Sequence, residues 1–320
     1  MATASNPTNG TSAQAEGQQE QASAKSGAPI GFIGLGHMGG NMAARFLAAG
    51  YEVHGEAQSR DGAKQLIDDG LEWRDTPREV AEGAEIVFTS LPNDDVLEQV
   101  ASGADGILAG LGGEKVLVDV STVSPRYSRS LAERVAAIGS QMLDAPVSGS
   151  VPQVQSGTLT IMVGGADDAY ARVEPILREL GTPTHVGDNG QGLALKLAIN
   201  ISLAVQMLAF AEGLLLADRS GIDRELAAGV MTASPIGSPM LQAREQLVLD
   251  LPETAWFDIG LMQKDVALAL DTGRQLSVPL PSAAAADQML TVARAAGYER
   301  RDLAALFEVL ANVAVTAPAE

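Results

Sequence analysis

A lysine lies within an almost continuously apolar stretch, residues 192–217, which reads GLALKLAINISLAVQMLAFAEGLLLA. Lys196 is followed one helical turn later by Asn200, so a helix would place both side chains on one face. Burial disfavours the charged ammonium and lowers its pKa toward neutrality, which suits a group that both gives and takes a proton. The alternative is a lysine whose stem lies along apolar surface while its charge reaches water.

A glycine-rich turn near the N-terminus predicts a binding site for phosphates. In IGFIGLGHMGGNMAARFLAAG, after Pro29, Gly34, Gly36 and Gly39 separate a short β-type run from a helical pattern. In a dinucleotide-binding unit the first glycine permits the turn and the second lets a pyrophosphate approach the backbone. The third lets the helix pack on the strand. A second strand, YEVHGEA, follows the helix, which favours a Rossmann-type domain.

Two further apolar runs, residues 84–92 and 114–122, end at Pro or Ser/Thr and are separated by helical segments. They are typical of strands in a parallel sheet. Ligands of such sheets lie beyond the carboxyl ends of the strands, which places four residues at the cofactor edge. These are Leu91, Pro92, Ser121 and Thr122, and each of them could equally be a simple turn residue.

The end of the second strand bears on the choice between NAD(H) and NADP(H). An acid at this place accepts hydrogen bonds from the ribose hydroxyls and repels a 2′-phosphate, but Ala57 stands where it is expected. Ser59, Arg60 and Lys64 follow as candidate phosphate ligands, with Glu56 as the counter-argument. We expect NADP(H), with NAD(H) as the alternative.

Composition excludes several other classes of protein. The 320 residues carry a net charge of −19, no cysteine and only three histidines, which disfavours both a nucleic-acid partner and a metal site. Lys196 and Glu212 interrupt the long apolar stretch, so we expect no membrane span. Residues 1–28 are rich in Ser, Ala, Gln and Gly and resemble neither a signal nor a transit peptide. We expect a disordered tail and a cytoplasmic protein.

Four segments together resemble the β-hydroxyacid dehydrogenases, of the 3-hydroxyisobutyrate dehydrogenase and tartronate semialdehyde reductase type. They are GFIGLGHMG, DAPVSGSVPQVQSGTLTIMVGG (residues 144–165), KLAIN (196–200) and LMQKDVALAL (261–270). The resemblance covers roughly residues 29–310 and implies an α/β fold with an N-terminal Rossmann-type domain. It places that domain at 29–190 and an all-α domain at 191–320, joined by one long helix, 191–217, with the active site in the cleft between them.

The resemblance also assigns roles to particular residues. It makes Lys196 the catalytic acid/base, assisted by Asn200. Ser148, Gly149 and Ser150 would receive the substrate carboxylate, and Lys264 would lie near substrate and nicotinamide. The alternative for Lys264 is an exposed lysine that pairs with Asp265. The expected cofactor contacts are Gly34, Leu35, Gly36, His37, Met38, Gly39, Ser59, Arg60, Leu91, Pro92, Thr122 and Lys264.

The expected activity is reversible hydride transfer between a nicotinamide cofactor and a small 3-hydroxy acid or its semialdehyde. Phosphogluconate-type relatives have a histidine where this chain has Ile199, which disfavours a phosphorylated sugar. The alternatives are a reductase similar to imine reductases, which Lys196 argues against, and a non-catalytic nucleotide-binding scaffold. The repeated amphipathic helices of the C-terminal part predict a homodimer or homotetramer.

Overall fold

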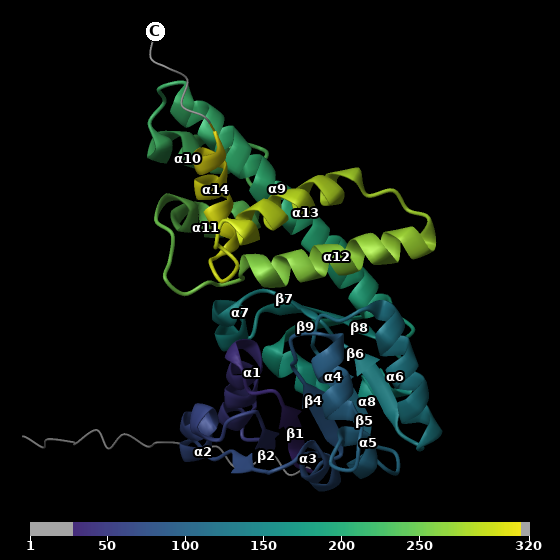
Figure 1. Ribbon diagram of the computed structural model, residues 1–320. Coiled ribbons are helices and arrows are strands. Elements are labelled where there is room, and N and C mark those ends of the chain that lie inside the picture. The colour runs from purple at the N-terminus through teal and green to yellow at the C-terminus, as the bar shows by residue number, and fades with distance from the viewer. Residues whose placement is uncertain (1–27, 315–320) are drawn as a thin grey trace, which may run out of the picture.

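The computed structural model describes residues 28–314, which form an α/β part and a helical part joined by one long helix (Figure 1). The predicted disordered tail, residues 1–28, falls outside these residues except for its last position. The fold class expected from the sequence is confirmed.

One nine-stranded sheet forms the centre of the α/β part, and its first six strands in sequence are parallel. Their order is β3-β2-β1-β4-β5-β6, the doubly wound order in which a crevice opens between β1 and β4. Beyond β6 the sheet becomes mixed, because β8 pairs antiparallel with β6 and β7, and parallel with β9. The strands are β1 (Ile30–Ile33), β2 (Val53–Glu56), β3 (Glu72–Trp73), β4 (Ile86–Thr89), β5 (Val116–Asp119), β6 (Gln141–Asp144), β7 (Val147–Ser148), β8 (Leu159–Gly164) and β9 (Gly181–Gly187).

Apolar clusters cover both faces of this sheet, as the unbroken apolar runs of the parallel strands require. Phe32 of β1 belongs to one cluster and its neighbour Ile33 to the other, because successive side chains of a strand point to opposite faces. The helices that close these layers are α1 (His37–Ala48), α2 (Lys64–Asp68), α3 (Pro77–Gly83), α4 (Asp94–Ala101), α5 (Ile107–Gly110), α6 (Pro125–Ala137), α7 (Val151–Ser156) and α8 (Asp167–Leu180).

The long helix α9 (Gln191–Arg219) runs from the sheet through the helical part, and α12 lies across it (Figure 1). It ends two residues later than the helix expected at 191–217. Leu193 packs in the α/β core, whereas Met207 and Leu214 belong to the core of the helical part. The remaining helices are α10 (Arg224–Ala233), α11 (Pro239–Leu249), α12 (Ile259–Leu276), α13 (Pro281–Ala295) and α14 (Leu306–Val313). The boundary at 190/191 stays a prediction.

Within residues 28–314, α9 is the one helix long and apolar enough to cross a membrane by length and composition. Its first turns pack against β6, β8 and β9, and later turns pack against α12, α13 and α14. The buried apolar residues of α9 therefore belong to both packed units, as an apolar helix that passes through two cores requires.

Candidate active site

The glycine turn between β1 and α1 has the geometry that its spacing predicts. Gly34 has φ +93°, and a Cβ there would lie 2.4 Å from the carbonyl oxygen of Ser90. A Cβ at Gly39 would lie 2.1 Å from the oxygen of Gly34, so the helix packs directly on the turn. A Cβ at Gly36 would meet nothing within 4 Å, which leaves open space beside the backbone.

The N-terminus of α1 is left without a side-chain cap. Gly36 is its N-cap, no side chain accepts a hydrogen bond from its first turn, and that turn holds no acidic residue. Free N–H groups and the positive end of the helix dipole therefore face the space beside Gly36, an arrangement that suits a pyrophosphate. His37 is exposed and Met38 half-buried, whereas Leu35 is buried in the core, so only its backbone remains for a cofactor.

The carboxyl ends of β4 and β5 are tied together next to this turn. The Leu91 N–H donates to the Ser121 hydroxyl (2.8 Å), and the Leu91 side chain lies against Gly34. Thr122, the next residue, accepts a hydrogen bond at its carbonyl oxygen from the Lys264 ammonium. Pro92 is exposed at the same edge. The expected edge residues thus come together, and one of them contacts the helical part.

Residues after β2 form an exposed corner. β2 ends on Glu56, whose pKa is raised by burial, and Ala57 follows it without a charge. The Arg60 guanidinium lies 6.0 Å from the centre of the Trp73 ring, while Ser59 accepts a hydrogen bond from the Gly62 N–H (3.3 Å).

Lys64, the other cation near this corner, already pairs with Asp68 at 2.6 Å. Among the residues that the structure describes, Arg60 is therefore the cation of this corner that is not paired with a carboxylate.

Lys196 lies in the first turns of α9, half-buried between the two parts of the molecule. Burial lowers the pKa of its ammonium to about 8, the nearby carboxylate of Asp265 opposes this effect, and the positive charge of Lys264 adds to it. Between residues 28 and 314 its ammonium has no protein hydrogen-bond partner. The ammonium is therefore available to a bound molecule and changes its protonation state near neutral pH.

Asn200 contacts a partner that the sequence did not predict. Its Nδ2 donates to Oδ2 of Asp265 on α12 (2.6 Å), and both side chains are almost fully buried. Oδ1 of Asn200 has no protein hydrogen-bond partner among the described residues. Asn200 thus contacts α12, and its free oxygen still allows it to accept a hydrogen bond.

Lys264 bridges the two parts of the molecule. Its ammonium donates to the Thr122 carbonyl and lies 2.9 Å from Oδ1 of Asp265, at ion-pair distance but without hydrogen-bond geometry. The sequence predicted Asp265 only as the partner of Lys264 in the alternative in which that lysine is not part of the site. In the structure that carboxylate is the centre of the site, because it influences Lys196, Asn200 and Lys264 at once.

The substrate loop expected at Ser148, Gly149 and Ser150 lies between β7 and α7. Gly149 is exposed with φ +136°, a conformation that favours glycine. The Ser150 N–H, however, already donates to Oε1 of Gln153 (2.8 Å). Gln153, which is not among the expected site residues, therefore engages one of the backbone N–H groups of the substrate loop. β7 packs against α9, so the loop lies on the same side of the molecule as the helix with Lys196.

A possible cation cluster and a groove lie away from this site. Glu52, His54 and Glu72 bring potential ligand atoms within 4.8 Å of one another, at the strand ends opposite the glycine turn. Arg74 already occupies part of this cluster, because its Nη2 lies 2.9 Å from Oε2 of Glu72 and 3.1 Å from Nε2 of His54.

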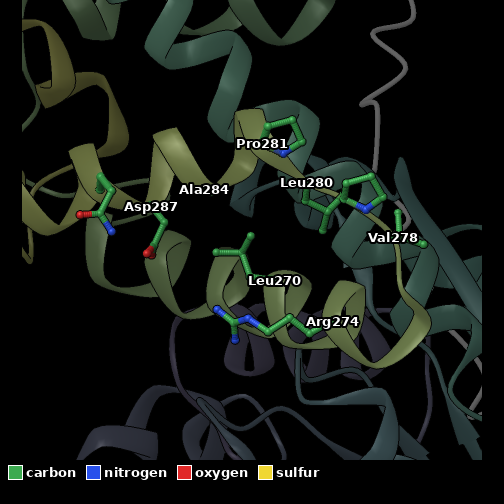
Figure 2. Close-up of a pocket in the computed structure, with 9 residues that line it drawn as sticks. Leu270, Arg274, Val278, Leu280, Pro281, Ala284 and Asp287 are labelled. Atoms are coloured by element: carbon green, nitrogen blue, oxygen red, sulfur yellow. The ribbon is translucent and has the colours of Figure 1, made fainter.

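The groove has a volume of about 500 Å³ and lies between α12 and α13 (Figure 2). Leu270, Leu280 and Ala284 line it, and Arg274, also in the groove, is paired with Asp271. It begins beyond Lys264 along α12, so it does not belong to the cluster around Asp265.

The doubly wound sheet, the open glycine turn and the half-buried lysine define an oxidoreductase of the dinucleotide-dependent class. Comparison with protein families agrees with this class. Residues 29–188 match the NAD-binding domain of 6-phosphogluconate dehydrogenase, and residues 190–310 match the NAD-binding domain of NADP-dependent 3-hydroxyisobutyrate dehydrogenase.

Characterised relatives extend over most of the chain. The 2-(hydroxymethyl)glutarate dehydrogenase of Eubacterium barkeri is 35% identical, over 88% of this chain and 94% of its own. The 3-hydroxyisobutyrate dehydrogenase of Pseudomonas aeruginosa is 34% identical (86% and 95%). The 2-hydroxy-3-oxopropionate reductase of Escherichia coli is 33% identical (88% and 96%). The chain therefore belongs to the β-hydroxyacid dehydrogenase family and is an NAD(P)-dependent oxidoreductase.

Solved structures show the same architecture. The 3-hydroxyisobutyrate dehydrogenase of Salmonella typhimurium superposes with a TM-score of 0.81 at 29% identity, covering 88% of this chain and all of that one. Psf3 in complex with NADP⁺ and 2-OPP gives a TM-score of 0.81 at 27% identity, with 88% and 99% covered. An imine reductase from Pseudomonas sp., at 22% identity and a TM-score of 0.59, shares the fold.

Proposed function

We propose that the protein transfers hydride reversibly between NADP(H) and a small 3-hydroxy acid or its semialdehyde, with Lys196 as the general acid/base. The observation that carries the proposal is the half-buried ammonium of Lys196, with its pKa lowered to about 8, beside the cluster of Asp265, Asn200 and Lys264. A bound nicotinamide would supply or accept the hydride, and the chain would handle the proton and the charge.

The residues of the glycine turn fit a dinucleotide. The open space at Gly36 and the uncapped start of α1 would receive the pyrophosphate, with Gly34 and Gly39 shaping the turn. Leu91, Pro92 and Thr122, at the ends of β4 and β5, would flank the nicotinamide side of the crevice.

The proton step follows from the two protonation states of Lys196. In reduction its ammonium would donate a proton to the carbonyl oxygen of the substrate, and in oxidation the neutral amine would take the proton from the hydroxyl. Because the pKa is about 8, both forms exist near neutral pH. The free Oδ1 of Asn200, one turn along α9, would accept a hydrogen bond from the lysine or from the substrate.

A small anionic substrate fits the donors of the site. Gly149 and the hydroxyls of Ser148 and Ser150 would bind its carboxylate, and Lys264 would balance its charge. These local donors matter because the net charge of −19 repels anions at long range. The substrates named for the three characterised relatives are all small hydroxy or oxo acids.

The corner after β2 supports NADP(H) over NAD(H). Ala57 brings no negative charge, and Ser59 and Arg60 offer a hydroxyl and an exposed guanidinium to a 2′-phosphate. Glu56 weakens the argument, but burial raises the pKa of its carboxyl group and so disfavours its charge. Separate titrations with NADPH and NADH test this preference, and tighter binding of NADH would overturn it.

A homodimer or homotetramer would cover apolar side chains that the helical part exposes. Leu216, Leu226, Val230 and Ile236 are each more than 60% exposed, on or between α9, α10 and α11. Light scattering on the full chain and on Leu226→Lys tests this expectation, since a monomer in both would refute it. A cytoplasmic location likewise stays a proposal.

Lys196→Met tests the catalytic role. We expect turnover with a panel of small hydroxy acids and semialdehydes to fall by at least about a thousandfold while NADPH binding persists. Near-normal turnover would refute the role of Lys196. If the unmodified chain binds NADPH but turns over no member of the panel, the scaffold alternative is favoured, and turnover of imines alone would favour the imine-reductase alternative.

A further inference from the structure

Asp144 is fully buried at the end of β6 and contacts the start of the helix that carries Lys196. Its Oδ1 accepts a hydrogen bond from the Gly190 N–H (2.6 Å), and its Oδ2 accepts one from the Leu193 N–H (2.9 Å). Gly190 is the N-cap of α9 and has no side chain to cap it. A carboxylate that is 46 positions earlier in the chain therefore satisfies N–H groups that the helix itself leaves free.

Two glycines bring the helix close enough for this contact. A Cβ at Gly164, the last residue of β8, would lie 2.7 Å from Oδ1 of Asp144 and 2.9 Å from the Gly192 nitrogen. A Cβ at Gly192, in the first turn of α9, would lie 2.8 Å from Oδ2 of Asp144 and 2.5 Å from the Met162 oxygen. We call Asp144, Gly164 and Gly192 the α9 seat. It explains both ends of the motif DAPVSGSVPQVQSGTLTIMVGG, which the substrate loop alone leaves unexplained.

The α9 seat lies about one helical turn from Lys196. Leu193, which donates to Asp144, precedes the lysine by three residues, a rise of roughly 4.5 Å along the axis. Within the described part of the chain no hydrogen bond holds the Lys196 ammonium, so the backbone of α9 sets the region that the ammonium can reach. The substrate loop starts at Ser148, four residues after Asp144, so the same strand end holds both the lysine helix and the loop.

We propose that Asp144 is a positioning residue for the reaction: through the seat it fixes the height and rotation of the first turn of α9 and thereby places the Lys196 ammonium against the substrate. This inference rests on the proposed role of Lys196. The two N–H donors and the positive end of α9 favour the carboxylate form of Asp144.

Burial acts against that form and raises the pKa of Asp144 to about 6. Two ionisable neighbours face this contact: Asp119, its register partner on β5, and Arg129 of α6, whose guanidinium lies against Gly190.

The first test is Asp144→Asn in the full chain. The amide keeps the size of the side chain but faces one N–H donor with its own NH₂ group, so the first turn of α9 must shift. A displacement of about 1 Å can lower turnover roughly 100-fold. We expect kcat to fall about 10- to 100-fold, with the KM for substrate and the Kd for NADPH changed less than about threefold. Asp188→Asn makes the same chemical change on an exposed residue just before α9 and should have no effect.

A second readout needs no turnover. The rate at which an amine-selective reagent labels Lys196 in the cofactor-free protein follows its neutral fraction, so its pH dependence reports the lysine pKa directly. In Asp144→Asn the midpoint should move by more than about half a pH unit from about 8, because the surroundings of the ammonium change. General loss of stability would not move it.

Gly192→Ala keeps the carboxylate, but its Cβ would push α9 away from Asp144. This variant tests the role of the α9 seat if Asp144→Asn does not fold. An unchanged kcat together with an unmoved labelling midpoint in a folded variant of either kind would overturn the inference. Failure of the proposed function is recognised separately, because Lys196→Met would then retain turnover.

Discussion

Replacement of Lys196 by methionine should abolish turnover and at the same time stabilise the protein. The ordinary pKa of a lysine is 10.5, and burial lowers that of Lys196 to about 8. This difference corresponds to roughly 3 kcal/mol of cost for holding the ammonium in the folded state. The side chain is only half-buried, and solvent screening reduces the expected cost to about 2 kcal/mol. Methionine has a similar length, carries no charge and removes this cost.

The stabilisation depends on pH in a defined way. Below about pH 8 the lysine is charged in both the folded and the unfolded chain, so the whole cost is present. Between pH 8 and 10.5 the unfolded chain binds a proton that the folded chain does not, and the stability of the unmodified protein rises with pH. The advantage of Lys196→Met should therefore be largest near pH 7 and should vanish above pH 10.5.

Denaturant unfolding at pH 7 and at pH 10.5 measures this difference directly. At pH 7 a gain of about 2 kcal/mol would also raise the melting temperature by roughly 4 °C. Lys64→Met is the matched control, because the Lys64 side chain is 73% exposed and its pair with Asp68 contributes less than about 1 kcal/mol. The reasoning is refuted if Lys196→Met is no more stable at pH 7, or if its gain is the same at both pH values.

Four further predictions concern the neighbours of this lysine, the cofactor turn and the corner after β2. Asp265→Asn removes the carboxylate that raises the pKa of Lys196, so the limb near pH 8 in the kcat profile should move down by roughly one unit. Gly36→Ala should fold normally, since its Cβ meets nothing within 4 Å, but it should weaken NADPH binding at least about tenfold. Gly34→Ala should lower the free energy of unfolding by about 2 kcal/mol or more, measured by denaturant unfolding. Arg60→Ala should weaken NADPH binding about tenfold and leave NADH binding nearly unchanged, measured by fluorescence titration.

Each of these predictions has a clear contrary result, which for Gly34→Ala is an unchanged free energy of unfolding. A limb that stays near pH 8 in Asp265→Asn would mean that another group titrates in the kcat profile. Tight NADPH binding by Gly36→Ala would place the pyrophosphate elsewhere, and equal losses of NADPH and NADH in Arg60→Ala would remove the argument for a 2′-phosphate contact.

Local features of this protein could be predicted from the sequence because their causes lie within a few residues. The spacing of Gly34, Gly36 and Gly39 fixes a tight turn, an open approach and a close helix contact, and the structure has all three. The apolar runs predict strands buried on both faces, and the long apolar stretch predicts α9 to within two residues of its end.

Contacts between distant segments had no comparable signal. Asn200 faces Asp265, 65 positions away, and nothing in the type of either side chain identifies the other as its partner. Asp144 stands in the same motif as the substrate loop, and only its position at the end of β6, against the first turn of α9, shows that it contacts the helix.

The sequence by itself thus determined the Rossmann-type domain, the long helix and the lysine within it, because backbone conformation and apolar periodicity are encoded locally. Only the tertiary structure decided which carboxylate lies near that lysine. The pKa of Lys196 depends on burial between the two parts of the molecule and on charges carried by α12. Desolvation and Coulomb interactions act through space, so they are defined only once the chain has folded and brought these helices together.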